Sequence, residues 1–220
     1  EELATDRVRV AMALSPVNAS DLIPITGAYR HRITLPAIAG YEGVGTVIQA
    51  PPQAAHLLGK RVLPLRGQGT WQCLVDCPAA FTVPVPDDIS DTLAARAYIN
   101  PLAALLMLNL YPPAGKHVLI TAAGSDCAAL LGQWALKRGA LSVTGVHRSP
   151  VHRQKLAECG IRPLEETRAA EIETLAQTTD IVYDATGGKL ADLLLSSMRK
   201  TALFVSYGLL SGQPYRVLPH

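Results

Sequence analysis

The sequence predicts an α/β protein with two parts, a partly open β-barrel followed by a doubly wound parallel sheet. Up to about residue 90, short β-like segments are separated by Gly and Pro, which is typical of small barrels. Beyond it, apolar strand-like and helix-like segments alternate, which indicates parallel strands joined by crossover helices. We place the two domains at residues 1–97 and 98–220.

In the first part, apolar alternation and Gly-flanked β-branched residues predict strands at residues 8–12, 43–48, 60–65 and 71–75. Residues 81–86 are expected to be extended, because Pro84 and Pro86 exclude a helix.

Ser90 or Asp91 can cap a short helix that runs to Ala95, and a helix over 102–110 is stopped by two prolines. Further strands are predicted at residues 117–121, 142–146, 180–184 and 202–207. The helices between them are expected at residues 128–138, 151–159 and 190–198, and Gly139 and Gly160 end the first two.

Composition excludes several classes of partner. The 220 residues are 49% hydrophobic with a net charge of +2, so neither nucleic acid nor an anionic membrane is expected. No apolar run is long enough to span a bilayer. Four scattered cysteines indicate ordinary thiols in a reducing compartment, so we predict a cytoplasmic protein, or a mitochondrial one in a eukaryote.

The turn after the strand at 117–121 is a candidate phosphate site. Gly124, Ser125, Asp126 and Cys127 lead into a helix, and such a turn lets backbone N–H groups meet a pyrophosphate. Only one glycine is present, and Asp126 places a negative charge near the expected phosphate. An ordinary strand-to-helix turn is the alternative.

The next strand ends in His147, Arg148 and Ser149, where an NAD site would place an acidic residue. Basic and hydroxyl groups suit a 2′-phosphate, so NADPH is favoured over NADH, with a solvated basic turn as the alternative. Small residues at 184–188 and 206–212 leave room for the nicotinamide half. Each of these turns alone could be an ordinary connection, but four such turns at the ends of successive predicted strands favour a nucleotide site.

Five segments, residues 17–21, 40–45, 69–71, 184–188 and 205–208, resemble the medium-chain dehydrogenase/reductase superfamily. The resemblance implies a GroES-like barrel domain and a Rossmann domain. Within the superfamily, residues 69–71, 83–89 and 99–101 are most similar to the trans-2-enoyl-thioester reductases, with the quinone oxidoreductases next to them.

The resemblance implies no metal. Asn18 stands where zinc dehydrogenases place a catalytic Cys, Tyr41 stands where they place a His, and the four-Cys structural lobe is absent. Asn and Tyr are poor zinc ligands, so these positions are not expected to bind the zinc ion that metal-assisted alcohol oxidation needs.

The chemistry that the resemblance implies is hydride transfer from NADPH to the conjugated double bond of an enoyl thioester. Tyr29 matches a proton donor of these reductases, and Trp71 is expected to line the same pocket; a packed loop tyrosine is the alternative for Tyr29. Asn100 matches a cofactor contact, with a helix cap before Pro101 as the alternative. The predicted cofactor contacts are Asn18, Asn100, Gly124, Ser125, Asp126, Cys127, Arg148, Ser149, Thr186, Tyr207, Gly208 and Leu209.

The chain departs from the resembling reductases at the altered Gly-rich turn, at Ala103 in place of a threonine, and at its ends. Because relatives begin earlier and continue further, we expect both domains to be incomplete here. Two alternatives stay open: an NADPH:quinone or enone oxidoreductase, and a non-catalytic nucleotide-binding relative. A homodimer paired through the edge near residues 202–207 is expected, with a small-molecule substrate.

Overall fold

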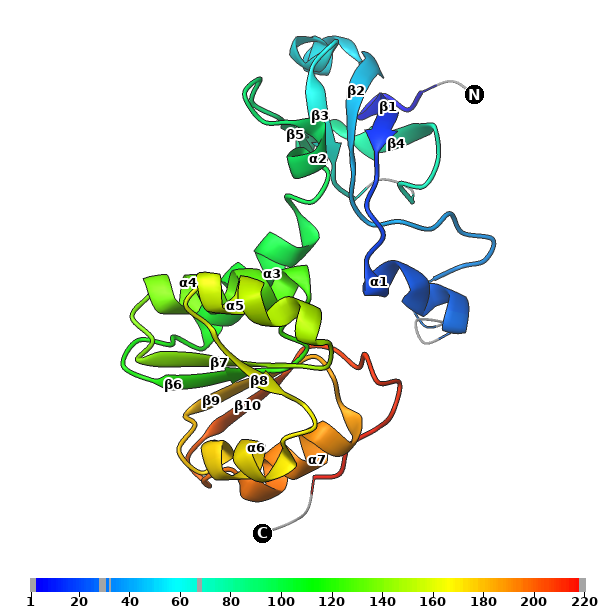
Figure 1. Cartoon of the computed structure of the whole chain (residues 1–220). Helices are drawn as coiled ribbons and strands as arrows, with labels where there is room; N and C mark the ends of the chain where they lie inside the picture. Colours follow the sequence, from blue (N-terminus) through cyan, green and yellow to red (C-terminus); the bar gives the residue numbers. More distant parts are fainter. Residues whose placement is uncertain (1–2, 28–30, 32, 67–68, 218–220) are drawn as a thin grey trace. The chain divides into compact units, whose positions relative to one another are not determined.

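The structure is a computed structural model that describes residues 3–27, 31, 33–66 and 69–217. The chain divides into two compact units, residues 1–99 and 100–220, and each is described by itself (Figure 1). The expected boundary, after residue 97, lies close to this division. In the described part of the chain, no helix is long and apolar enough to cross a membrane.

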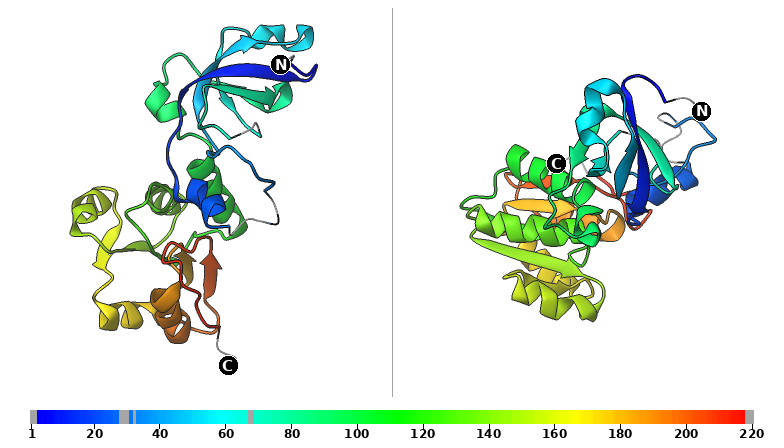
Figure 2. Two further views of the ribbon diagram at one scale, coloured as in Figure 1. Left: turned by 90° about the vertical axis from the view of Figure 1, so that its right-hand side faces the viewer. Right: turned by 90° about the horizontal axis from the view of Figure 1, so that it is seen from above.

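The first unit is built on a five-stranded antiparallel sheet in the order β4-β1-β2-β3-β5. Its strands are β1 Arg7–Leu14, β2 Val44–Gln49, β3 Arg61–Pro64, β4 Leu74–Pro78 and β5 Thr82–Pro84. Figure 2 shows β1, in dark blue, between β2 and β4. Val10 pairs with Val47 on one side and with Val75 on the other, and all three are buried. The alternation over 8–12 therefore supplies this core.

Short helices connect these strands. They are α1 Ala19–Leu22, η1 Ile23–Thr26, η2 Pro52–Leu57, η3 Ala79–Phe81 and α2 Asp91–Ala94. Ser90 caps α2 by accepting a hydrogen bond from the Leu93 N–H, as its sequence position predicts. The strand predicted at 71–75 was placed too early, because the N–H groups of Thr70 and Trp71 donate to the carbonyls of Gly40 and Ala39, away from the sheet.

The second unit holds a five-stranded parallel sheet in the order β8-β7-β6-β9-β10. The strands are β6 His117–Ile120, β7 Ser142–His147, β8 Arg162–Glu165, β9 Ile181–Asp184 and β10 Leu203–Ser206. The helices are α3 Ile99–Leu110, α4 Asp126–Lys137, η4 Pro150–His152, α5 Arg153–Glu158, α6 Ala169–Ala176 and α7 Gly188–Ser197. The predicted fold class, a doubly wound parallel sheet with a separate antiparallel β domain, is confirmed.

The two faces of the parallel sheet pack against different helices. Ile120 lies in the buried cluster with Leu131 of α4, whereas its neighbour Leu119 lies in the cluster with Ile172 of α6 and Leu194 of α7. Figure 1 shows α4 and α5 on one face and α6 and α7 on the other. Both faces of β6 are thus buried, which explains its unbroken apolar run.

Strand β8 and helix α6 have no counterpart among the predicted elements. β8 has one fully buried side chain, Leu164, and contains Pro163, which an edge strand tolerates. In α6 the fully buried residues are Ile172 and Ala176, one turn apart. Their weak apolar pattern reads as a loop in the sequence. The helix predicted over 151–159 is a 3₁₀ turn followed by the shorter α5.

Candidate functional site

The carboxyl ends of the parallel strands form the first candidate site. The strand order places β6 between β7 and β9, although the chain passes from β6 to β7 and reaches β9 only after β8. In open parallel sheets, ligands bind beyond the carboxyl ends of the strands at such a change of direction. The predicted contacts at 124–127, 148–149, 186 and 207–209 follow β6, β7, β9 and β10, and therefore lie at this edge.

The turn between β6 and α4 is tight. Ala122 adopts a left-handed backbone with a φ of 48°. A Cβ built on Gly124 would meet the His152 ring, so a side chain fits here only if that ring moves. Ser125 is the N-cap of α4, and its hydroxyl accepts the Ala128 N–H. Asp126 is the first residue of α4. Its negative charge interacts favourably with the positive end of the helix dipole but would repel a bound phosphate.

A buried carboxylate organises the turn after β9. Asp184 is fully buried, and Oδ1 accepts a hydrogen bond from the Thr121 hydroxyl at 2.6 Å. The same Oδ1 accepts the Thr186 N–H at 3.1 Å, and Oδ2 accepts the Gly187 N–H at 2.9 Å. The Thr121 hydroxyl also accepts the Ala185 N–H at 2.9 Å. Thr121 and Asp184 therefore hold the end of β6 and the turn after β9 together.

The loop after β10 pairs with that turn through the backbone. The N–H groups of Leu210 and Ser211 donate to the carbonyls of Ala185 and Thr186 at 2.8 and 2.9 Å. A Cβ on Gly208 would lie 3.0 Å from the Ala185 carbonyl oxygen, so the two chains approach closely. Thr186, Gly208 and Leu209, all predicted contacts, are brought together in this way.

Two buried polar atoms at the same edge have no hydrogen-bond partner among the described residues: His147 Nε2 and the Tyr207 hydroxyl. His147 ends β7, and its Nδ1 lies 3.0 Å from the Ser149 carbonyl oxygen. Tyr207 follows β10, and burial, helped by Cys127 and Asp184, raises the pKa of its phenol, which stays neutral. Buried polar groups nearly always have partners, so these two favour a polar ligand at this edge.

Arg148 is exposed and Ser149 is half-buried directly after β7. Cys127 lies in the first turn of α4, with Sγ 3.9 Å from the Asn100 carbonyl oxygen. Burial raises the pKa of Cys127 to about 11, so it is a neutral thiol and not a nucleophile. Asn100 is the second residue of α3, so the alternative that it caps this helix is wrong.

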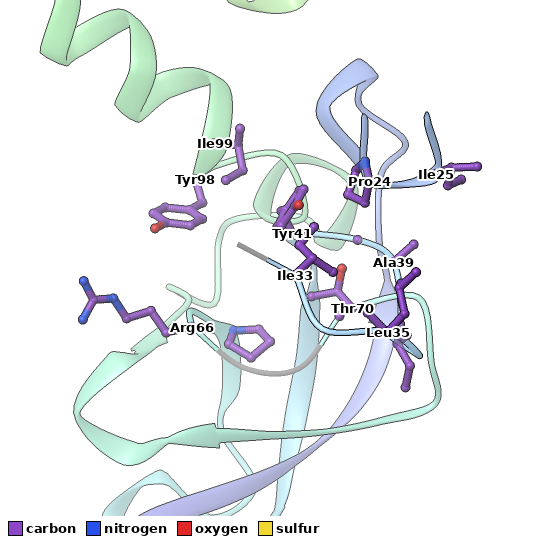
Figure 3. Close-up of a pocket in the computed structure, with 15 residues that line it drawn as sticks. Pro24, Ile25, Ile33, Leu35, Ala39, Tyr41, Arg66, Thr70, Tyr98 and Ile99 are labelled. Atoms are coloured by element: carbon purple, nitrogen blue, oxygen red, sulfur yellow. The ribbon is translucent and has the colours of Figure 1, made fainter. Parts of the chain in front are cut away.

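The first unit contains a cavity of about 450 Å³, a volume ordinary for a small-molecule site (Figure 3). Its walls are mostly apolar, with three uncharged polar side chains and one charge. The described lining residues are Pro24, Ile25, Ile33, Leu35, Ala37, Ile38, Ala39, Gly40, Tyr41, Pro64, Arg66, Gly69, Thr70, Tyr98 and Ile99.

The two predicted catalytic residues have different outcomes. Tyr29 lies outside the described residues. Trp71 is not among the residues that line the cavity; it borders a separate surface hollow, and its Nε1–H donates to the Pro16 carbonyl at 3.1 Å. Its ring also lies where a Cβ on Gly40 would be, which packs the two segments together.

Asn18 belongs to a buried polar network in the first unit. Its amide nitrogen donates to Glu42 Oε1 at 2.7 Å, and its N–H donates to Asp21 Oδ2 at 2.6 Å. Glu42 Oε2 accepts the Ile99 N–H at 2.9 Å, and Asp21 Oδ1 accepts the Tyr41 N–H at 3.0 Å. Both carboxylates are thus engaged by donors of this unit. In the described parts of the chain, no group of three or more His, Cys, Asp or Glu could hold a metal ion.

Comparisons with known proteins agree with this geometry. Residues 4–87 match the family model of the alcohol dehydrogenase GroES-like domain. The crystal structure of a putative NADPH:quinone reductase from Bacillus thuringiensis is 39% identical, with a TM-score of 0.89 over 98% of this chain and 67% of that one. The chain belongs to the medium-chain dehydrogenase/reductase superfamily.

Within the medium-chain superfamily, the chain lies near the enoyl reductase and quinone oxidoreductase branches, as its sequence motifs predict. The human mitochondrial enoyl-[acyl-carrier-protein] reductase is 30% identical over 97% of this chain. The chain spans 61% of that reductase and 65% of the one from Xenopus tropicalis, about three fifths of the length of these relatives.

Several residues of this medium-chain protein were not recognised from the sequence as parts of a site. Arg66, Tyr98 and Ile33 line the cavity, yet they come from three separate segments. Thr121 and Asp184 stand in turns expected at the cofactor site, but their hydrogen bond to each other was not predicted. Their spacing carries no motif, because cavities and buried networks join residues that are far apart in sequence.

Proposed function

We propose that this chain is an NADPH-dependent reductase that transfers a hydride to the conjugated double bond of an enoyl thioester. The observation that carries this proposal is the alignment of 97% of the chain with a mitochondrial enoyl-[acyl-carrier-protein] reductase. The similar protein from Bacillus thuringiensis is described as a putative NADPH:quinone reductase, which supports NADPH as the cofactor. The carboxyl edge of the parallel sheet and the apolar cavity supply the two binding places that such a reaction needs.

The residues at the carboxyl edge fit a phosphorylated dinucleotide. Arg148 and Ser149 would hold the 2′-phosphate, and backbone N–H groups of the turn at Gly124 would meet the pyrophosphate. The unpartnered atoms of His147 and Tyr207 would gain partners. Asp126 is the exception, because its charge lies at the phosphate-binding end of α4. NADPH supplies the hydride when bound.

The cavity would hold the apolar part of the substrate and exclude water from it. We propose that the Tyr29 hydroxyl delivers a proton to the substrate, since reduction leaves a negative charge on the α-carbon and the carbonyl oxygen. Asn18 and Asn100 remain proposed cofactor contacts. We also propose that the protein forms a homodimer through β10, which is an edge strand of the parallel sheet, and light scattering tests this. The proposed location is the cytoplasm or the mitochondrion.

An NADPH:quinone or enone oxidoreductase is the second candidate, favoured by the 39% identity to a putative quinone reductase. A non-catalytic nucleotide-binding protein is the third, favoured by Asp126 in the phosphate turn. The three differ in what they turn over rather than in how they fold.

The test measures NADPH affinity by fluorescence titration and then NADPH oxidation with a crotonyl thioester and with a benzoquinone. Thioester turnover, lowered by Tyr29→Phe and unchanged by Tyr215→Phe, supports the first proposal. Turnover with the quinone alone supports the second, and tight binding without turnover the third. A protein that does not bind NADPH contradicts all of them.

A further inference from the structure

One charged side chain lies among the described residues that line the cavity: Arg66. Figure 3 shows Arg66 and Tyr98 at one side of the cavity, with Pro24, Ile25 and Leu35 at the other. Arg66 therefore places a cation at one margin of a mostly apolar cavity. A neutral apolar substrate has no anionic group to pair with this cation.

Arg66 is an exposed residue whose side chain makes one aromatic contact. It follows β3 in the left-handed backbone region, with a φ of 56°, which is uncommon for a residue other than glycine. Its guanidinium lies over the Phe81 ring, 4.4 Å from the centroid, a cation–π contact that restricts the side chain. Backbone strain and a restrained rotamer at a cavity edge favour a functional role.

Two other arginines of the same unit have acidic partners. Arg9 pairs with Asp76 at 2.7 Å, and Arg61 pairs with Asp91 at 2.6 Å. Arg66 has no carboxylate within ion-pair distance among the residues that the structure describes. Its flat guanidinium fork matches a carboxylate or phosphate.

We propose that Arg66 receives the anionic group of an amphiphilic substrate whose apolar part occupies the cavity. The inference rests on the proposed function, and it narrows the substrate to molecules that carry a carboxylate or a phosphate beside an apolar chain. The anion could belong to the acid itself or to a phosphorylated carrier joined through the thioester. A simple quinone is neutral and offers Arg66 no anionic group.

The test measures binding of saturated, unreactive ligands to the full chain by isothermal titration calorimetry. Hexanoyl-coenzyme A is compared with the uncharged S-hexanoyl-N-acetylcysteamine, and hexanoate with hexanamide. The variants are Arg66→Gln, which removes the charge, and Arg66→Lys, which keeps it without the fork. Lys60→Gln removes an exposed charge of the same unit outside the cavity and serves as the control. Urea denaturation of each variant checks that it is folded.

We expect Arg66→Gln to weaken one of the two anionic ligands about tenfold, which corresponds to one charged hydrogen bond. Both uncharged ligands and the Lys60→Gln protein should be unaffected, Arg66→Lys should be intermediate, and added salt should reduce the difference. An effect on hexanoyl-coenzyme A alone identifies a phosphorylated carrier, and one on hexanoate alone a carboxylate. Equal weakening of charged and uncharged ligands, no effect, or no binding to the unaltered protein overturns the inference.

Because this test needs neither NADPH nor turnover, its outcome is separate from that of the proposed reaction. Charge-dependent binding without turnover would retain the anion site and reject the reductase. Turnover with Arg66→Gln showing unchanged KM for an anionic thioester would retain the reductase and reject the anion site.

Discussion

Replacement of Thr121 by Val removes the hydroxyl that joins β6 to the turn after β9. The Thr121 hydroxyl donates to the buried Asp184 carboxylate at 2.6 Å and accepts the Ala185 N–H at 2.9 Å. Valine has nearly the same shape, so no cavity forms and the loss is polar. A hydrogen bond to a charged group contributes about 1.5–3 kcal/mol, and an unsatisfied buried N–H costs about 1–3 kcal/mol.

Asp184 keeps the N–H donors of Thr186 and Gly187, so the lower end of these ranges applies. We expect Thr121→Val to lower the free energy of unfolding by about 3 kcal/mol. Thr121→Ser is the matched control: it keeps both hydrogen bonds and loses one methyl group, at a cost of about 1 kcal/mol.

Urea denaturation measures both variants, and an unchanged m value shows that the unfolded states are comparable. We also expect Thr121→Val to weaken NADPH binding, because the turn at 186–188 loses its anchor to β6. If Thr121→Val is as stable as Thr121→Ser, the hydrogen bonds of this carboxylate do not hold the site, and the reasoning is refuted.

Three further predictions follow from single contacts. Gly124→Ala should destabilise the protein by about 1–3 kcal/mol, because its Cβ would meet the His152 ring; His152→Ala should restore most of this in a double-mutant cycle, and additive effects would show that the ring is not the obstacle. The Arg9 hydrogen bond lowers the pKa of Asp76 from its ordinary 3.8, so the pair stabilises the protein above pH 3.8 and this contribution disappears as the pH falls through the lowered pKa. Asp76→Asn should therefore cost about 1 kcal/mol at neutral pH and nothing in strong acid, as measured by denaturation at several pH values; a pH-independent difference contradicts the ion pair. Tyr207→Phe removes a buried hydroxyl without a partner among the described residues, so the free protein should be no less stable while NADPH binds more weakly in calorimetry; unchanged affinity would show that this hydroxyl does not meet the cofactor.

The fold could be predicted because its signals are local. The alternation at Val8 and Val10 matches two fully buried positions of β1, and Ser90 caps α2 as its sequence position suggests. Gly139 and Gly160 adopt positive φ at the ends of α4 and α5. Where the local signal was weak, as at β8, the element was missed, because the burial of a single leucine in an edge strand depends on its neighbours.

By itself, the sequence determined the order of most strands and helices and the superfamily, and it predicted the turns at which a dinucleotide would bind. These properties follow from patterns within a few residues and from strand direction, which places successive carboxyl ends at one edge. The tertiary structure alone decided that the Thr121 hydroxyl donates a hydrogen bond to Asp184. It also decided that the charged side chain of Arg66 lines a mostly apolar cavity and that Trp71 borders a different hollow. Such contacts depend on packing between distant segments, where side-chain position and burial are properties of the folded chain.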